Sequence, residues 1–133
     1  MAAPTEPSNM TVLVVDDDAD IRELIVMVAK KEGYATTSAT NGAEALQKIR
    51  MDLPDIVLLD VMMPVLDGYH TAQAITRDET ITKKPLIYFI TSRDPHKEGK
   101  IMEFSGASGV ISKPFNINQI KNLLHEAAGK LHC

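Results

Sequence analysis

The chain has 133 residues, enough for one domain with a hydrophobic core and too few for two. Its 14 Lys and Arg against 18 Asp and Glu give a formal charge of −4, which argues against direct nucleic-acid binding, because that needs a basic face. No apolar run is long enough for membrane insertion, no signal peptide opens the chain and the single cysteine, Cys133, is its last residue, so a cytoplasmic protein is expected.

Strand-like and helix-like segments alternate along the chain, which indicates an α/β fold with a doubly wound parallel sheet. Residues 1–10, with two prolines and no basic residue, are expected to form a flexible leader. Residues 11–130 are expected to form the domain and residues 131–133 a short tail. Five strands are expected at residues 11–15, 34–38, 56–59, 86–90 and 110–112.

Five helices are expected, and most of their starts carry an Asp or Asn that can cap a helix. The first has capping-box spacing between Asp20 and Glu23 and ends at Gly33. The fourth contains Gly99, which costs about 1 kcal/mol against alanine, so this helix is expected to be weak. The starts are expected near Asp20, at Asn41, near Tyr69, at Asp94-Pro95 and after Asn116.

Charged side chains stand where three of the expected strands end. Asp16 and Asp17 follow the first strand, Asp60 follows the third and Lys113 follows the fifth. The carboxyl ends of parallel strands meet at one edge of an open sheet, where ligands bind. Three carboxylates and one ammonium should therefore share a crevice, and crowded carboxylates favour a hard metal ion beside a reactive aspartate.

Asp60 is the candidate nucleophile, because a carboxylate can attack phosphorus when a cation offsets the repulsion between anions. Asp17 and Asp60 could coordinate Mg²⁺ directly, and Asp16 could hold one of its waters. Thr91, at the end of the fourth strand, could donate its hydroxyl to a phosphoryl oxygen or could be an ordinary β-branched strand residue.

The motifs resemble, in order and by element, the receiver domain of two-component response regulators, over about residues 10–130. They are Asp16-Asp17, Asp60-Val61-Met62-Met63-Pro64, Asp67-Gly68, Thr91-Ser92 and Lys113-Pro114-Phe115. The resemblance implies a flavodoxin-like fold with strand order 2-1-3-4-5.

The resemblance also implies what the site residues do. Asp60 would accept a phosphoryl group from a phosphohistidine on a sensor histidine kinase or a histidine phosphotransfer protein. Asp17, Asp60 and the backbone carbonyl of Met62 would bind Mg²⁺, with Asp16 acting through water.

Two further residues would respond to the phosphoryl group. Lys113 would pair with the phosphoryl group, and the peptide bond between Lys113 and Pro114 is expected to be cis. Thr91 would move toward it and carry its loop along, so that phosphorylation biases a two-state element. Many members of the family have an aromatic residue where this chain has Val110, so we expect the region from Arg93 to Phe104 to carry the output instead.

The resulting hypothesis is a stand-alone, chemotaxis-type receiver that switches binding to a downstream protein and is a signalling phosphoacceptor rather than an enzyme. Three alternatives stay open. A phosphatase with an aspartyl nucleophile would need a second carboxylate, and position 62 is Met62. The chain could also be a receiver-like module that is never phosphorylated, or a piece of a larger regulator. Asp18 and Asp20 have cap spacing and are interpreted as helix caps.

Overall fold

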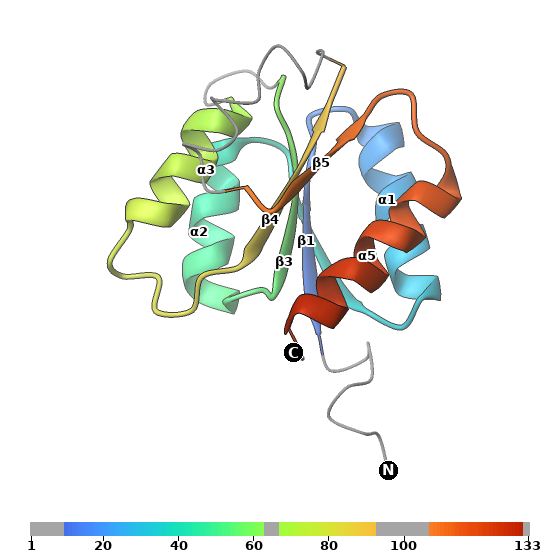
Figure 1. The fold of residues 1–133 in the computed structure, drawn as a ribbon. Coiled ribbons are helices and arrows are strands. Elements are labelled where there is room, and N and C mark those ends of the chain that lie inside the picture. The colour runs from blue at the N-terminus through green and yellow to red at the C-terminus, as the bar shows by residue number, and fades with distance from the viewer. Residues whose placement is uncertain (1–9, 63–66, 93–106, 132–133) are drawn as a thin grey trace.

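A five-stranded parallel sheet forms the centre of the fold, with helices on both faces (Figure 1). The computed structural model describes residues 10–62, 67–92 and 107–131. The strands are β1 (Thr11–Val15), β2 (Ala35–Ala39), β3 (Ile56–Asp60), β4 (Leu86–Thr91) and β5 (Gly109–Ser112). They lie in the order β2-β1-β3-β4-β5 and all neighbours are parallel, which confirms the expected sheet and its order.

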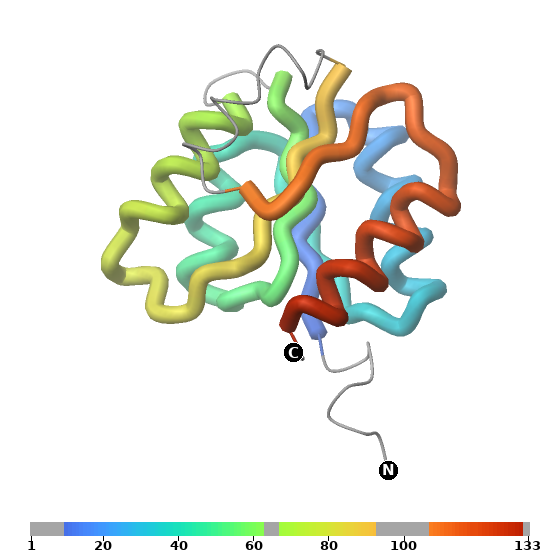
Figure 2. Tube along the Cα trace, in the orientation of Figure 1, coloured from blue at the N-terminus to red at the C-terminus, as the bar shows by residue number. Residues whose placement is uncertain are grey.

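The helices divide between the two faces of the sheet. In the described residues they are α1 (Ala19–Lys31), α2 (Gly42–Asp52), α3 (Gly68–Arg77) and α5 (Ile117–Leu131). Figures 1 and 2 show α2 and α3 on one face and α1 and α5 on the other. Four of the five expected helices are thus described, and the one expected to open at Asp94 lies outside the described residues. None of these helices is long and apolar enough to cross a membrane.

The central strand β3 shows why the aliphatic runs are unbroken. Val57 and Leu59 pack into the core under α2 and α3, whereas Ile56 and Leu58 pack into the core under α1 and α5. All four side chains are fully buried. Each contributes roughly 1.5–3 kcal/mol relative to exposure, so both faces of the strand must be apolar.

Helix α1 begins at Ala19, closer to Asp16 and Asp17 than the start expected near Asp20. Its N-cap is Asp18 and not Asp20, since the Asp18 carboxylate accepts from the N–H groups of Asp20 and Ile21. Asp20 lies in the first turn, where a carboxylate interacts favourably with the helix dipole. The helix therefore begins at Ala19, directly after Asp18 and two residues after Asp17, which leaves little freedom in the loop that follows β1.

The second strand begins one residue later than expected, because Tyr34 completes the end of α1. The N–H of Gly33 donates to Lys30 and that of Tyr34 to Ala29, a Schellman motif in which Gly33 takes φ 95°. The N–H of Tyr34 is therefore not available for a hydrogen bond to β1. The hydroxyl of Tyr34 donates to the carbonyl of Leu124 in α5.

The described domain includes residues at both ends that were expected in flanking segments. Met10, expected in the leader, is buried, and its carbonyl accepts from the N–H of Ala35. Leu131, expected in the tail, is the last residue of α5. The helix itself begins with the expected cap, in which Asn116 and Gln119 each accept from the backbone N–H of the other.

Candidate functional site

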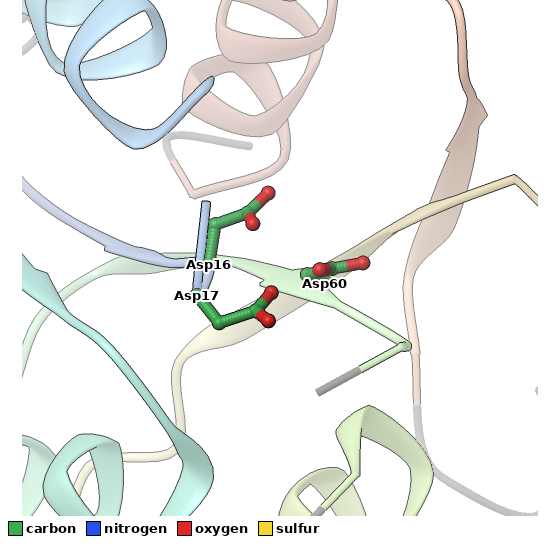
Figure 3. Close-up of side chains that lie close together, drawn as sticks. All are labelled: Asp16, Asp17 and Asp60. Atoms are coloured by element: carbon green, nitrogen blue, oxygen red, sulfur yellow. The ribbon is translucent and has the colours of Figure 1, made fainter. Parts of the chain in front are cut away.

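Three carboxylates meet at the carboxyl ends of β1 and β3, which are neighbours in the sheet. Figure 3 shows Asp16 and Asp17 after β1 and Asp60 at the end of β3, with their side chains on the same side of the sheet edge. One carboxylate oxygen of each lies within 4.8 Å of the others. Asp16 and Asp60 are buried, and Asp17 is exposed, so the cluster opens to solvent through Asp17.

Asp16 is fixed by contacts from three directions. Its N–H donates to the carbonyl of Ala39 at 3.2 Å, and its carboxylate accepts from the N–H of Asp18 at 2.9 Å. The guanidinium of Arg22 donates to its backbone carbonyl, also at 2.9 Å. The sequence analysis did not identify Arg22, although its position one turn into the helix that follows the aspartates was a usable signal.

Lys113 brings the positive charge into this cluster. Its Nζ lies 3.4 Å from Oδ2 of Asp16 and 3.4 Å from Oδ1 of Asp60, and its side chain is 20% exposed. The Lys113 N–H donates to the Thr91 carbonyl at 2.7 Å, which extends the pairing of β4 and β5 by one residue. The peptide bond to Pro114 is cis, as expected.

The other candidate residues lie at the same edge. Thr91 ends β4 and is fully buried. Met62 is exposed, and its N–H donates to Oδ1 of Asp60 at 3.2 Å. Val110 is partly buried and lies opposite Phe89 in the ladder of β4 and β5. The segment from Arg93 to Phe104, expected to carry the output, lies outside the described residues.

The electrostatics of the cluster single out Asp60. Burial, followed by the Asp16 carboxylate, raises the pKa of Asp60 from its ordinary 3.8 to about 7. Lys113 and the N–H of Met62 favour the carboxylate and oppose this rise in pKa, but they do not overcome the burial. In the absence of a further cation, Asp60 therefore stays protonated below neutral pH and loses its proton at about pH 7.

The donor set fits a divalent metal ion. Three carboxylates face one ammonium, which leaves two negative charges uncompensated when all three are ionised. Mg²⁺ takes oxygen ligands, commonly one or two carboxylates, and keeps several waters. Asp17 and Asp60 would hold such an ion, while Asp16, engaged by Asp18 and Lys113, would act through water.

Without Mg²⁺, the free energy of unfolding is expected to fall as the pH rises from about 4 to about 7. The pKa of Asp60 is raised in the folded state, so over this range the native protein holds a proton that the unfolded chain has released. Each unit of pKa difference corresponds to about 1.4 kcal/mol. Urea unfolding in a chelator across this pH range measures the effect.

The control for this pH dependence is Asp60→Asn, which cannot titrate. As the pH rises from about 4 to about 7, the free energy of unfolding of Asp60→Asn should increase relative to that of the parent. Asp52→Asn, at an exposed site on α2, should follow the parent. A constant difference between Asp60→Asn and the parent would contradict the raised pKa.

The family model of the response regulator receiver domain matches residues 12–125, and the chain belongs to this family. A probable transcriptional regulator, ycf27 of Guillardia theta, is 36% identical over 110 residues, which are 83% of this chain and 42% of that protein. The alkaline phosphatase synthesis transcriptional regulatory protein PhoP of Bacillus subtilis is 30% identical over 112 residues, or 84% of this chain and 45% of that one. The chain thus spans less than half the length of these curated relatives.

Solved structures of similar fold agree with this assignment. The chemotaxis response regulator CheY4 of Vibrio cholerae superposes with a TM-score of 0.81 at 29% identity, over 89% of this chain and 98% of that one. The receiver domain of the Francisella response regulator 1452 also superposes with a TM-score of 0.81, at 27% identity, over 92% of this chain and 99% of that one.

Proposed function

We propose that Asp60 accepts a phosphoryl group from a phosphohistidine on a sensor histidine kinase or a histidine phosphotransfer protein. The observation that carries this proposal is the position of the Asp60 carboxylate, beside two further carboxylates and 3.4 Å from the ammonium of Lys113. An oxygen-rich pocket of this charge suits a metal ion, and the adjacent ammonium suits an incoming anion.

The transfer forms a bond between an Asp60 carboxylate oxygen and phosphorus and breaks the bond from phosphorus to the imidazole nitrogen of the donor. Lys113 would offset the charge of the arriving phosphoryl oxygens, and its contacts to Asp16 and Asp60 already hold the Nζ at the site. Mg²⁺, when bound, would supply Lewis-acid stabilisation of the same oxygens. Met62 would contribute its backbone carbonyl to the ion.

The response to phosphorylation would begin at Thr91. Its hydroxyl would donate to a phosphoryl oxygen, and its position at the end of β4 would pass the movement to the segment that follows. Val110 is β-branched and stiff about χ1, so it offers no ring that could exchange between two orientations. The phosphoryl group would therefore shift the equilibrium through Thr91 and its loop, by its differential interaction with the two states.

The partners that we propose are a phosphohistidine donor and a downstream protein that distinguishes the two states. Several relatives are described as transcriptional regulators or DNA-binding response regulators. For this chain, with a formal charge of −4, we propose protein partners and no direct contact with nucleic acid. The protein would act as a signalling phosphoacceptor and not as an enzyme on other substrates.

Phosphotransfer from radiolabelled donors tests this function. Candidate histidine kinases and phosphotransfer proteins, phosphorylated beforehand, should lose label to the chain in the presence of Mg²⁺ and not in a chelator. Asp60→Asn should accept none, whereas Asp52→Asn should accept label at the parental rate. Label on Asp60→Asn at the parental rate would contradict the proposal.

A further inference from the structure

A groove of about 480 Å³ lies along α1 beside the edge strand β2, outside the carboxylate cluster. Val26 and Met27 form the apolar part of its lining, and Met27 is 43% exposed. In Figure 1, α1 lies beside α5 on one face of the sheet. The proposed phosphotransfer does not use these residues.

Basic side chains surround this groove without carboxylate partners. Arg22, Lys30 and Lys31 line it, and none of them forms an ion pair within the described part of the chain. The acidic residue that lines it is Glu23. In a protein of net charge −4, a local excess of unpaired cations beside exposed apolar surface indicates an acidic binding partner.

Arg22 is held in a fixed position at one end of the groove. One of its N–H groups donates to the backbone carbonyl of Asp16 at 2.9 Å. A guanidinium has five donors, so others can bind a carboxylate while this bond is kept. Because the side chain is already ordered, binding there loses less conformational entropy than binding to a free arginine.

We propose that this groove binds an acidic segment of a partner protein that carries an apolar side chain. The apolar side chain packs on Val26 and Met27, and carboxylates pair with Arg22 at one end and with the lysines at the other. From Arg22 to Lys31 the helix rises by about 13 Å, which an extended segment of about four residues spans.

Titration of the ¹⁵N-labelled 133-residue chain with a short peptide of alternating glutamate and leucine tests the groove. Amide shifts are expected between Arg22 and Lys31 and in β2, saturating at millimolar peptide or below. Raising the salt to about 0.5 M should weaken binding, because the pairing is partly solvent-exposed. A peptide with lysine in place of glutamate should cause no saturating shifts.

Charge reversal locates the binding to the groove. The double variant Lys30→Glu, Lys31→Glu should bind the acidic peptide at least tenfold more weakly. Arg77→Glu, which reverses a cation in the last turn of α3, away from the groove, should bind it as the parent does. Three results would overturn the proposal: no shifts along α1 at millimolar peptide, equal binding by the double variant, or binding of phosphatidylglycerol vesicles in place of the peptide.

Discussion

Mg²⁺ at a hundredfold excess over its Kd is expected to raise the free energy of unfolding by about 2.7 kcal/mol. The native state holds the oxygens of Asp16, Asp17 and Asp60 within 4.8 Å of one another, and the unfolded chain separates them. An ion held by Asp17 and Asp60, with Asp16 acting through water, would bind the native state alone, so its binding energy would add to stability. Urea unfolding at pH 7.5, with Mg²⁺ or with a chelator, measures the difference.

Asp17→Asn is the matched control for Mg²⁺ binding, because Asp17 is exposed and its replacement leaves the buried pair in place. This variant should lose most of the stabilisation by Mg²⁺, whereas Asp52→Asn should keep it. Since the pKa of Asp60 is raised to about 7, the stabilisation should also shrink at pH 5, where protons compete with the ion. Equal stabilisation of the parent and Asp17→Asn would place the ion elsewhere.

Gly68→Ala is expected to destabilise the protein by about 1–3 kcal/mol, the usual cost of forcing extra atoms into a packed site. A Cβ at Gly68 would lie 2.5 Å from the carbonyl oxygen of Asp60 and 2.7 Å from Cα of Val61. Both are backbone atoms, so neither can rotate away. The displaced backbone is that of the proposed phosphoacceptor, so phosphorylation should slow as well. Chemical denaturation and the rate of phosphorylation by a small phosphodonor measure the two effects.

Gly129→Ala is the matched control for this substitution. Gly129 lies in α5, and a Cβ there would meet nothing within 4 Å. Alanine favours the helix by up to about 1 kcal/mol over glycine, so this variant should gain stability. The same propensity would favour Gly68→Ala, at the start of α3, if the close approach to Asp60 were absent. A Gly68→Ala variant as stable as Gly129→Ala would therefore contradict the close approach.

Local patterns were sufficient to predict most of the strands and helices, whereas the order of the strands came from the resemblance to receiver domains. The run from Ile56 to Leu59 indicates a strand buried on both faces, and its side chains do divide between the two cores. The expected caps at Asn41 and Asn116 are observed, because each depends on neighbours three residues away. The cap of α1 was expected at Asp20 and lies at Asp18, because each aspartate in this run can cap a helix. The start of β2 was expected at Tyr34 and lies at Ala35, because Tyr34 could end α1 or begin β2.

Contacts between residues far apart in the sequence could not be predicted from local sequence patterns. Lys113 and Asp16 are 97 residues apart, and the sequence suggested their meeting only through the topology of the sheet. The motif containing Gly68 was recognised, but its close approach to the Asp60 carbonyl requires the path of the loop in space. The groove beside β2 likewise depends on how α1 lies against the sheet edge.

Mapping the phosphoryl group shows which carboxylate accepts it. The protein is treated with acetyl phosphate and Mg²⁺, reduced with borohydride to convert an acyl phosphate to the alcohol, and sequenced by tandem mass spectrometry. We expect one phosphoryl group by intact mass before the reduction, a reduced residue at position 60 after it, and neither in Asp60→Asn. Reduction at Asp16 or Asp17, or equal phosphorylation of Asp60→Asn, would contradict it.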